Sequence, residues 1–397
     1  MKFNKWTLGL AAVGAVSMAS AVRADEAPKM SQVQTALSAT TLSGYVDVAA
    51  QYNLGNPSKT SLTTPVAYGI GATTAATAGG IKDGFSLNDV DIALDKPLDD
   101  SPWASGYHVE LNAGQDGLGE VAAAGGAAGG AGGLNGGIRQ AYVTMRTPVG
   151  SGITWKFGAF DGITGYEGNT GYSNPNYTRS YGWAINPASQ VGLLGSYTIC
   201  SAISLQAGIV NRDAASSNPS GVGHEVSSKS YVALLTLTAP DSWGWIKGSA
   251  LNVGTIQTFD AYGQNNYTAS LTLNTPVTGL KGGLAYDHIQ ALAGFNGGYG
   301  VDGSVYGIYA TYQQTDKLSY NARAEYIDFP TAGFNFYPGI PFGSQGEEVT
   351  VDVEYDLWAN MTTRVEGRWD HDEHFTVFNQ NGTQNAFLLA LNLVYKF

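Results

Sequence analysis

Apolar and polar positions alternate along most of this chain, and the alternation is clearest at the C-terminus. The last segment, Asn385–Phe397, has a mixed face that includes Asn392 and Lys396. The opposite face is wholly apolar and consists of Phe387, Leu389, Leu391, Leu393, Tyr395 and Phe397. This pattern predicts a strand in a barrel wall, with lipid outside and a wetter interior. A half-buried strand of a soluble β-sandwich would alternate in the same way.

Other segments repeat the alternation with a period of two. In Leu42–Tyr52, Val46, Val48, Ala50 and Tyr52 oppose Tyr45, Asp47, Ala49 and Gln51. Gly84–Asp95, Ile153–Phe160, Tyr267–Asn274 and Val349–Tyr355 alternate similarly. Two expected strands, Arg139–Thr147 and Trp245–Thr255, do not show which residues share a face.

Proline marks the ends of several expected strands. The motifs are D-K-P-L (Asp95–Leu98), R-T-P-V (Arg146–Val149), T-A-P-D (Thr238–Asp241) and N-T-P-V (Asn274–Val277). A proline just after a strand ends the hydrogen-bonded ladder without breaking it. Each motif therefore predicts a short turn. Three more short connections are expected at Ile199–Ala202, Gln313–Lys317 and Asp356–Met361.

The connections between these hairpins are long. They cover roughly 53–83, 114–137, 161–190, 211–229, 256–265, 289–302, 329–346 and 371–384. Short turns at one end and long loops at the other are typical of outer-membrane barrels. A soluble sandwich has no reason to alternate loop lengths, and a β-helix would show a short regular repeat. We therefore predict an all-β transmembrane antiparallel barrel of about 16 strands, with short periplasmic turns and long extracellular loops.

The N-terminus has the features of a secretory signal peptide. Lys2 and Lys5 precede an apolar, Ala-rich stretch, and Val22–Ala24 is a small-residue cleavage site. We predict a signal peptide over residues 1–24, a short periplasmic segment over 25–41, and the barrel over 42–397. Beyond residue 24 no apolar run approaches the roughly 20 residues that a membrane helix needs.

Composition and charge narrow the function. Only 13% of the 397 residues are charged, against about a quarter in ordinary globular proteins, and Gly (53) and Tyr (23) are abundant. The formal net charge is −12, and cleavage of the signal peptide would leave −15. Such a charge argues against nucleic acid as a partner. The single cysteine, Cys200, cannot form an internal disulfide.

If the apolar faces meet lipid, the charged positions of opposite parity line the lumen, since charge facing lipid at mid-depth costs about 2–4 kcal/mol. Acids outnumber bases among them, so we expect a mild cation preference. The alternative is that these charges neutralise one another and hold strand register. The pore-lining candidates are Asp47, Asp89, Asp91, Glu110, Lys156, Arg323, Glu325, Asp352, Glu354, Arg364, Glu366 and Arg368.

The third long loop, Asp161–Gln190, differs from the others. It is rich in Tyr, Asn and Pro, and it carries Glu167 and Arg179. Such a loop can pack on itself or against the wall. By analogy with general porins, whose third loop narrows the lumen, Glu167 and Arg179 are candidates for a constriction. The alternative is an external loop that supports its neighbours.

Enzyme and metal chemistry find little support in the sequence. Asp370–His374 (D-H-D-E-H) contains metal-binding residue types but lacks the H-E-x-x-H spacing. The chain has no G-x-S-x-G motif. We expect no catalytic site, no metal and no cofactor, although sequence order alone leaves a distant catalytic constellation open.

Several stretches together resemble the OmpL-like group of β-barrel porins of Gram-negative outer membranes. They are L-S-G-Y-V-D (Leu42–Asp47), F-S-L-N-D-V-D-I-A-L-D-K-P (Phe85–Pro97), R-Q-A-Y-V (Arg139–Val143), W-K-F-G-A-F (Trp155–Phe160), G-Y-E (Gly165–Glu167) and N-P-N-Y-T-R-S-Y (Asn174–Tyr181). The resemblance covers essentially the whole chain after the signal peptide. The Gly/Ala-rich run within 114–137 departs from it.

The resemblance implies an outer-membrane channel for small hydrophilic solutes. It also implies contact with outer-membrane lipid and lipopolysaccharide, and with the barrel-assembly machinery, which would read the strand ending at Phe397. A homotrimer is expected by analogy with general porins. Two other functions stay open: a barrel enzyme of lipase or protease type, and a plugged structural or adhesive barrel.

Overall fold

The computed structural model describes residues 40–54, 83–114, 121–122, 135–211, 229–258, 264–291, 301–329, 345–373 and 384–397. At positions 121–122, 135–136, 291 and 301 only the backbone is described. The described residues form one sheet of seventeen strands. One of these, β4 (Val121–Ala122), has only two residues.

The other strands have nine or more residues each. They are β1 (Thr41–Leu54), β2 (Gly84–Lys96), β3 (Ser105–Gly114), β5 (Asn135–Thr147), β6 (Ile153–Asp161), β7 (Ser189–Cys200), β8 (Ile203–Asn211), β9 (Lys229–Thr238), β10 (Ala250–Thr258), β11 (Gln264–Asn274), β12 (Leu280–Ala291), β14 (Val301–Gln313), β15 (Leu318–Asp328), β16 (Gln345–Trp358), β17 (Met361–Asp372) and β18 (Asn385–Lys396).

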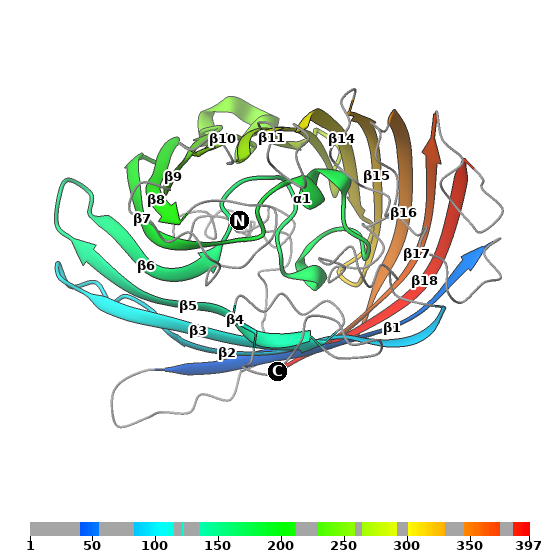
Figure 1. Ribbon diagram of the computed structural model, residues 1–397, viewed down its shortest axis with the longest axis horizontal. Helices are drawn as coiled ribbons and strands as arrows, with labels where there is room; N and C mark the ends of the chain where they lie inside the picture. Colours follow the sequence, from blue (N-terminus) through cyan, green and yellow to red (C-terminus); the bar gives the residue numbers. More distant parts are fainter. Residues whose placement is uncertain are drawn as a thin grey trace.

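These long strands close into a barrel. Each pairs antiparallel with its neighbours in the chain, and β1 pairs with β18 from Tyr45–Lys396 to Leu54–Phe387. Figure 1 shows the strands around a ring, with the short helix α1 (Tyr181–Ile185) inside it. The predicted all-β antiparallel barrel is therefore confirmed. Within the described residues, no helix is long and apolar enough to cross a membrane.

The short connections lie at one end of the barrel, as the proline-marked turns predicted. Residues 201–202 join β7 to β8, and residues 359–360 join β16 to β17. The barrel seam ends at the same side, where the backbones of Gly44 and Phe397 exchange two hydrogen bonds of 3.0 Å. The strand ends that the long connections join lie at the other end. The Gly/Ala-rich run falls largely outside the described residues.

One predicted strand begins later than expected. The expected strand Trp245–Thr255 starts instead at Ala250, and a 3₁₀ segment, η5 (Asp241–Ile246), precedes it. Gly244 breaks that segment with a φ of +65°, a conformation that side chains disfavour. Trp243 and Trp245 are consequently exposed at the turn. Trp103 and Trp358 are also exposed at short turns, which is where an aromatic belt at a membrane interface would lie.

Side chains on β18 divide between the two faces as the alternation predicted. Leu389 and Leu391 are exposed on the outside, whereas Leu388 and Asn392 are buried inside. The strand therefore presents its apolar face to the surroundings of the barrel, which in a membrane are lipid.

The strand register shifts at four places, and two of these β-bulges lie within the barrel wall away from the short turns. The registers shift so that Asn88 on β2 and Arg139 on β5 are extra residues without a direct partner. A bulge places two consecutive residues on nearly the same side of the sheet. Asn88 and Asp89 are accordingly both buried, and Arg139 lies inside the barrel. The bulge in β5 explains why the alternation of Arg139–Thr147 could not be interpreted from the sequence.

Part of the barrel interior is an apolar core. It lies against β6–β10 and includes Ile163, at the start of the third loop. Its other members are Phe160, Leu194, Val210, Val232, Leu234 and Ile256, with Tyr142 packed against them. The interior therefore has an apolar side, and the charged positions gather elsewhere.

We expect that replacing Leu391 with arginine lowers the amount of folded barrel in the membrane. The site is mid-strand on the outer face, where an arginine costs about 2–4 kcal/mol. Heat-modifiability on gels would measure the folded fraction. The matched control is Leu54→Arg, at the end of β1 on the same face, where the cost falls to about 0–1 kcal/mol. Equal folding of both variants would mean that the face is assigned wrongly.

Deleting Phe397 should slow assembly more than it changes the folded barrel. The deletion removes both backbone hydrogen bonds to Gly44 and the ring that covers Gly44 at the seam. Pulse-chase assembly in cells would measure the rate, and refolding of purified chain into detergent is the comparison. Assembly at the normal rate would contradict the assignment of Phe397 as an assembly signal.

Candidate functional site

The third long connection, between β6 and β7, folds into the barrel. It contains η4 (Gly171–Ser173) and α1, and α1 lies within the ring of strands. Asn176 and Tyr181 of this loop are fully buried. The loop reaches strands far from it in sequence, because its residues bond to β12, β15 and β17.

Two wall carboxylates hold the loop backbone. Glu366 on β17 accepts hydrogen bonds from the amides of Tyr177 (2.6 Å) and Thr178 (3.0 Å). Glu325 on β15 accepts from the next pair along the loop, the amides of Tyr181 (2.6 Å) and Gly182 (3.0 Å). Hydrogen bonds to a charged acceptor are stronger than neutral ones. Each carboxylate thus satisfies two consecutive buried amides of the loop.

Three wall arginines hold the loop carbonyls. Arg323 donates to the carbonyl of Thr178 at 2.8 Å, and Arg368 donates to the carbonyl of Arg179 at 2.6 Å. Arg364 donates to the carbonyl of Tyr172. The wall therefore contacts both the amides and the carbonyls of the loop backbone.

Each of these arginines also pairs with an acid on the wall. Arg323 Nε lies 2.6 Å from Glu348, Arg364 Nε lies 2.9 Å from Glu354, and Arg368 lies 2.8 Å from Asp370. The three arginines are at most 2% exposed. An arginine removed from water needs such partners, since an unpaired buried charge is strongly destabilising. We define the loop–wall network as Glu325, Glu366, Arg323, Arg364 and Arg368 with their wall acids and the loop backbone.

The predicted constriction residues, Glu167 and Arg179, are both buried inside the barrel. Glu167 pairs with Arg323 at 2.7 Å and accepts from the amide of Ser180 at 2.8 Å. Arg179 folds back on its own loop, where it donates to the carbonyl of Gly168 at 2.7 Å and stacks over Trp183. Glu167 thus joins the loop–wall network, whereas these contacts of Arg179 shape the loop itself.

Tyrosine and asparagine side chains attach the rest of the loop. Tyr181 donates to Asp370 at 2.7 Å, and Asn186 donates to Asp287 at 2.7 Å. The ring of Tyr166 stacks on Tyr309 with centroids 4.0 Å apart. Burial raises the pKa of the Tyr166 hydroxyl to about 12, so it stays protonated at neutral pH. The loop is therefore fastened along its length, from residue 166 to residue 186.

A second charged group lies on β1–β3. Asp47 accepts from Asn88 and Asn392, and Asp89 accepts from the hydroxyl of Tyr45 at 2.5 Å. Arg139 lies 2.6 Å from Glu110, 2.7 Å from Asp161 and 3.9 Å from Asp91. A single arginine thus faces three carboxylates, which gives this side of the lumen an excess of acid.

The structure brings most of the pore-lining candidates into one of these two groups. Glu325, Glu354, Arg323, Arg364, Glu366 and Arg368 belong to the loop–wall network, and Asp47, Asp89, Asp91 and Glu110 to the group on β1–β3. Asp352 is buried on the wall, where it accepts from Asn321 at 3.1 Å. Lys156 is separate from both groups, with its ammonium 4.7 Å above the ring of Tyr142.

Several residues of the site were not among the sequence candidates. Glu348 shares the inward parity of Thr350, Asp352 and Glu354. It was missed because β16 begins earlier than the strand expected from the sequence. Arg139 was missed because of its bulge. Asp287 sits at an inward position that alternation could have identified, and the inward position of Asp370 did follow from alternation. The contacts of Tyr177 and Tyr181 depend on how the loop folds, which no local pattern in the sequence reveals.

The D-H-D-E-H segment does not gather into a metal site in the described residues. His371 lies on the outer face, where it contacts Asn385 and stacks on Trp369. Asp370 and Asp372 are buried on the inner face, and His374 lies outside the described residues. Across the described part of the chain, no group of three His, Cys, Asp or Glu residues could hold a metal.

The sequence of this barrel matches a known protein family over almost its whole length. Residues 39–397 match the family model described as "Putative beta-barrel porin-2, OmpL-like". The chain belongs to this family. The resemblance found in the sequence is thereby confirmed. No protein with a curated description matches the chain.

Solved outer-membrane proteins share the fold of this porin-family chain. A Salmonella typhi OmpF complex with daunomycin matches with a TM-score of 0.59 and 11% identity, covering 90% of this chain and 98% of that one. The outer-membrane channel DcaP of Acinetobacter baumannii matches with a TM-score of 0.56 and 10% identity, covering 93% and 100%. An anion-selective porin of Comamonas acidovorans matches with a TM-score of 0.51 and 12% identity, covering 90% and 99%. At such identities the similarity shows the fold alone.

We expect that Glu366→Ala loosens the third loop without opening the barrel. The change leaves the buried amides of Tyr177 and Thr178 without an acceptor, at a cost of about 1–3 kcal/mol for each. Hydrogen exchange at residues 177–182 should rise at least tenfold, while the amides of β17 and β18 stay protected. The control is Asn392→Ala, which removes a hydrogen bond between strands and leaves those loop contacts in place. Equal loop exchange in both variants would contradict the assigned role of Glu366.

Proposed function

We propose that this protein is a water-filled channel through which small hydrophilic solutes and ions diffuse passively across the outer membrane, with a mild preference for cations. The observation that carries the proposal is the third loop, which charged wall residues hold inside the barrel. Rings of charged side chains at a narrowed lumen select ions in other channels. A loop fixed in this way would narrow the passage permanently, because its position depends on no ligand.

The cation preference is supported by the charges inside the barrel. Among the buried charged residues of the described chain, thirteen are Asp or Glu and five are Arg. Each arginine has acid or carbonyl partners, so the excess of acid persists after pairing. An acidic lumen with walls of low dielectric concentrates cations. The similarity to an anion-selective porin does not oppose this proposal, because it concerns the fold and not the lumen residues.

The accessible part of the charged interior lies near the short-turn end and at the start of the third loop. The side chain of Asp95 is 41% exposed and that of Asp161 is 23% exposed, far more than the loop–wall network. His108 contacts Asp95 at 3.1 Å and Glu110 at 3.4 Å, which continues the acid group toward this end. We propose that solutes pass by these accessible residues, because the acids deeper on β1–β3 are buried and the apolar core occupies the interior beside β6–β10.

The location and partners follow from the same proposal. We propose that residues 1–24 direct export, that the barrel resides in the outer membrane with lipid and lipopolysaccharide around it, and that the assembly machinery recognises the strand ending at Phe397. A homotrimer is proposed by analogy with general porins. One structure with this fold, OmpT of Vibrio cholerae, is described as a trimer form.

A plugged barrel is the second candidate. One observation favours it: the pore-lining candidates on β15–β17 are almost completely buried beneath the third loop. A plugged barrel would insert into bilayers without a stable conductance, whereas a channel would give repeated open steps. We propose no enzymatic activity for either form.

Neutralising the accessible acids should weaken the cation preference. We expect the double variant Asp95→Asn/Asp161→Asn to lower the ratio of sodium to chloride permeability about twofold, since each change removes one negative charge from the accessible interior. The reversal potential of purified protein in a planar bilayer under a salt gradient measures this ratio.

The matched control is Asp99→Asn, which removes the same charge in a fully exposed turn. Hydrogen bonds from Ser101 hold the pKa of Asp99 below its usual value, so it is ionised at neutral pH. This variant should keep the wild-type ratio. A wild-type protein that prefers chloride would overturn the proposed selectivity, and an absence of conductance would favour the plugged barrel.

A further inference from the structure

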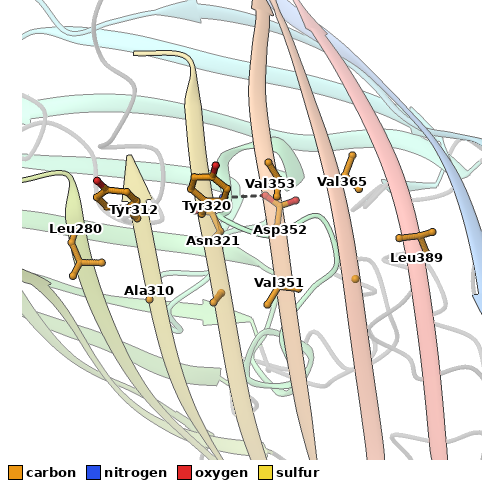
Figure 2. Close-up of a pocket in the computed structure, with 12 residues that line it drawn as sticks. Leu280, Ala310, Tyr312, Tyr320, Asn321, Val351, Asp352, Val353, Val365 and Leu389 are labelled. Atoms are coloured by element: carbon orange, nitrogen blue, oxygen red, sulfur yellow. Dashed lines mark hydrogen bonds between the residues drawn. The ribbon is translucent and has the colours of Figure 1, made fainter. Parts of the chain in front are cut away.

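The outer surface of the barrel carries an apolar hollow over β12–β18. It has a volume of about 600 Å³, within the range of about 300–1,000 Å³ typical of small-molecule sites. Figure 2 shows Tyr312, Tyr320, Val353 and Val365 along one side of it, on adjacent strands. These side chains are all exposed, so the hollow opens away from the lumen.

Small residues form the floor of the hollow. Ala310 on β14 is paired with Ala322 on β15, which is paired with Val351 on β16, and Val351 is paired with Gly367 on β17. Gly282 on β12 extends this row, because it is paired with Ala310. Larger residues flank the row on both sides: Tyr312 and Tyr320 toward the short turns, and Ile308 and Val349 toward the long loops.

Within the described chain, little fills the space beside the two glycines in this row. A Cβ on Gly367 would meet only Val351, at 3.9 Å, and one on Gly282 would meet nothing within 4 Å. By contrast, a Cβ on Gly303 would collide with Phe329, and one on the outward Gly195 would collide with Trp155. Glycine inside a strand weakens it unless something approaches closely. The open space at Gly282 and Gly367 therefore indicates an occupant from outside the chain.

The path of the row matches one lipid chain of the inner leaflet. Gly282 lies two residues past the start of β12 at the short turns, whereas Gly367 lies six residues past the start of β17. With a rise of about 3.3 Å per residue and strands tilted about 40°, Gly367 is about 10 Å further into the membrane. Crossing four strand spacings makes the row about 19 Å long. One leaflet of hydrocarbon is about 15 Å thick.

We propose that the hollow binds an acyl chain of a phospholipid from the inner leaflet, with its head group at the short-turn end and its tail near Gly367. The hollow begins at the short turns and not at the long loops, which favours a periplasmic-leaflet lipid over lipid A of the outer leaflet. A second copy of the barrel is the alternative occupant, because a cyclic trimer would set a different surface of the next copy against the hollow, and the cross-linking experiment distinguishes it from lipid. The turn beside Tyr320 carries both Asp316 and Lys317, so the head group is not selected by charge.

Photolabelling tests the site. The protein is reconstituted in vesicles of phosphatidylethanolamine and phosphatidylglycerol that contain a trace of phosphatidylcholine with a diazirine in its acyl chain. Mass spectrometry then maps the labelled residues after illumination. We expect several-fold more label on the outward residues of β14–β17 than on those of β8 and β9. Uniform labelling around the barrel would overturn the proposal.

Filling the hollow tests the assignment to these residues. Ala322→Leu/Gly367→Leu should reduce the label on β14–β17 several-fold, with folding checked by heat-modifiability. The matched control, Ala207→Leu/Ala233→Leu, alters two outward alanines paired on β8 and β9 and should leave the label unchanged. Unaltered labelling of a folded Ala322→Leu/Gly367→Leu variant would overturn the proposal. If that variant does not fold, the wild-type labelling map decides alone.

A cross-linker on the outer wall distinguishes a bound lipid from a second copy of the chain. With p-benzoylphenylalanine in place of Val351, we expect adducts with phospholipid. Cross-linked chain dimers or trimers in place of lipid adducts would show that another copy fills the hollow and would overturn the proposal. None of these experiments depends on conductance, so their results would be interpretable even if the barrel were plugged.

Discussion

The position of the third loop depends on charged side chains that are removed from water. Arg323, Arg364 and Arg368 each link a wall acid to a loop carbonyl, and Glu325 and Glu366 each accept two loop amides. Charges in such surroundings are costly unless every partner is present. The network is therefore strongly cooperative, because the loop needs the wall to satisfy its backbone and the wall needs the loop to satisfy its arginines.

This network and the apolar core divide the interior of the barrel. The core lies against β6–β10 and receives the start of the loop through Ile163. The network lies against β15–β17 and receives the middle of the loop. The loop therefore spans the lumen between an apolar attachment and a charged one. On the side lined by β1–β6, Asp95 and Asp161 are the more accessible acids.

The fold could be predicted from the sequence because a membrane barrel must place apolar side chains outside at every second position. This rule gave the outward face of the last strand, from Phe387 to Phe397. The proline motifs gave the short turns, and the alternation of short and long connections gave the even strand number. The rule failed at Arg139, because a bulge adds one residue and changes the parity. It failed at Trp245, because this strand-forming aromatic residue lies in a turn before the strand begins at Ala250. The inward residues could be named from parity, but their partners could not, since the contacts of Glu366 and Arg368 depend on the path of a distant loop.

The contacts of Glu325 and Glu366 with consecutive amides of the loop have a consequence for how such a protein can change. A carboxylate that binds backbone amides places no demand on the side chains of those residues. Substitutions that keep the backbone path would keep these four hydrogen bonds, but the side chains of Thr178 and Tyr181 also bind the wall, and a side chain on Gly182 would collide with Asp287. The wall thus fixes the backbone path of the loop, and loop side chains outside these contacts could change without rebuilding the barrel.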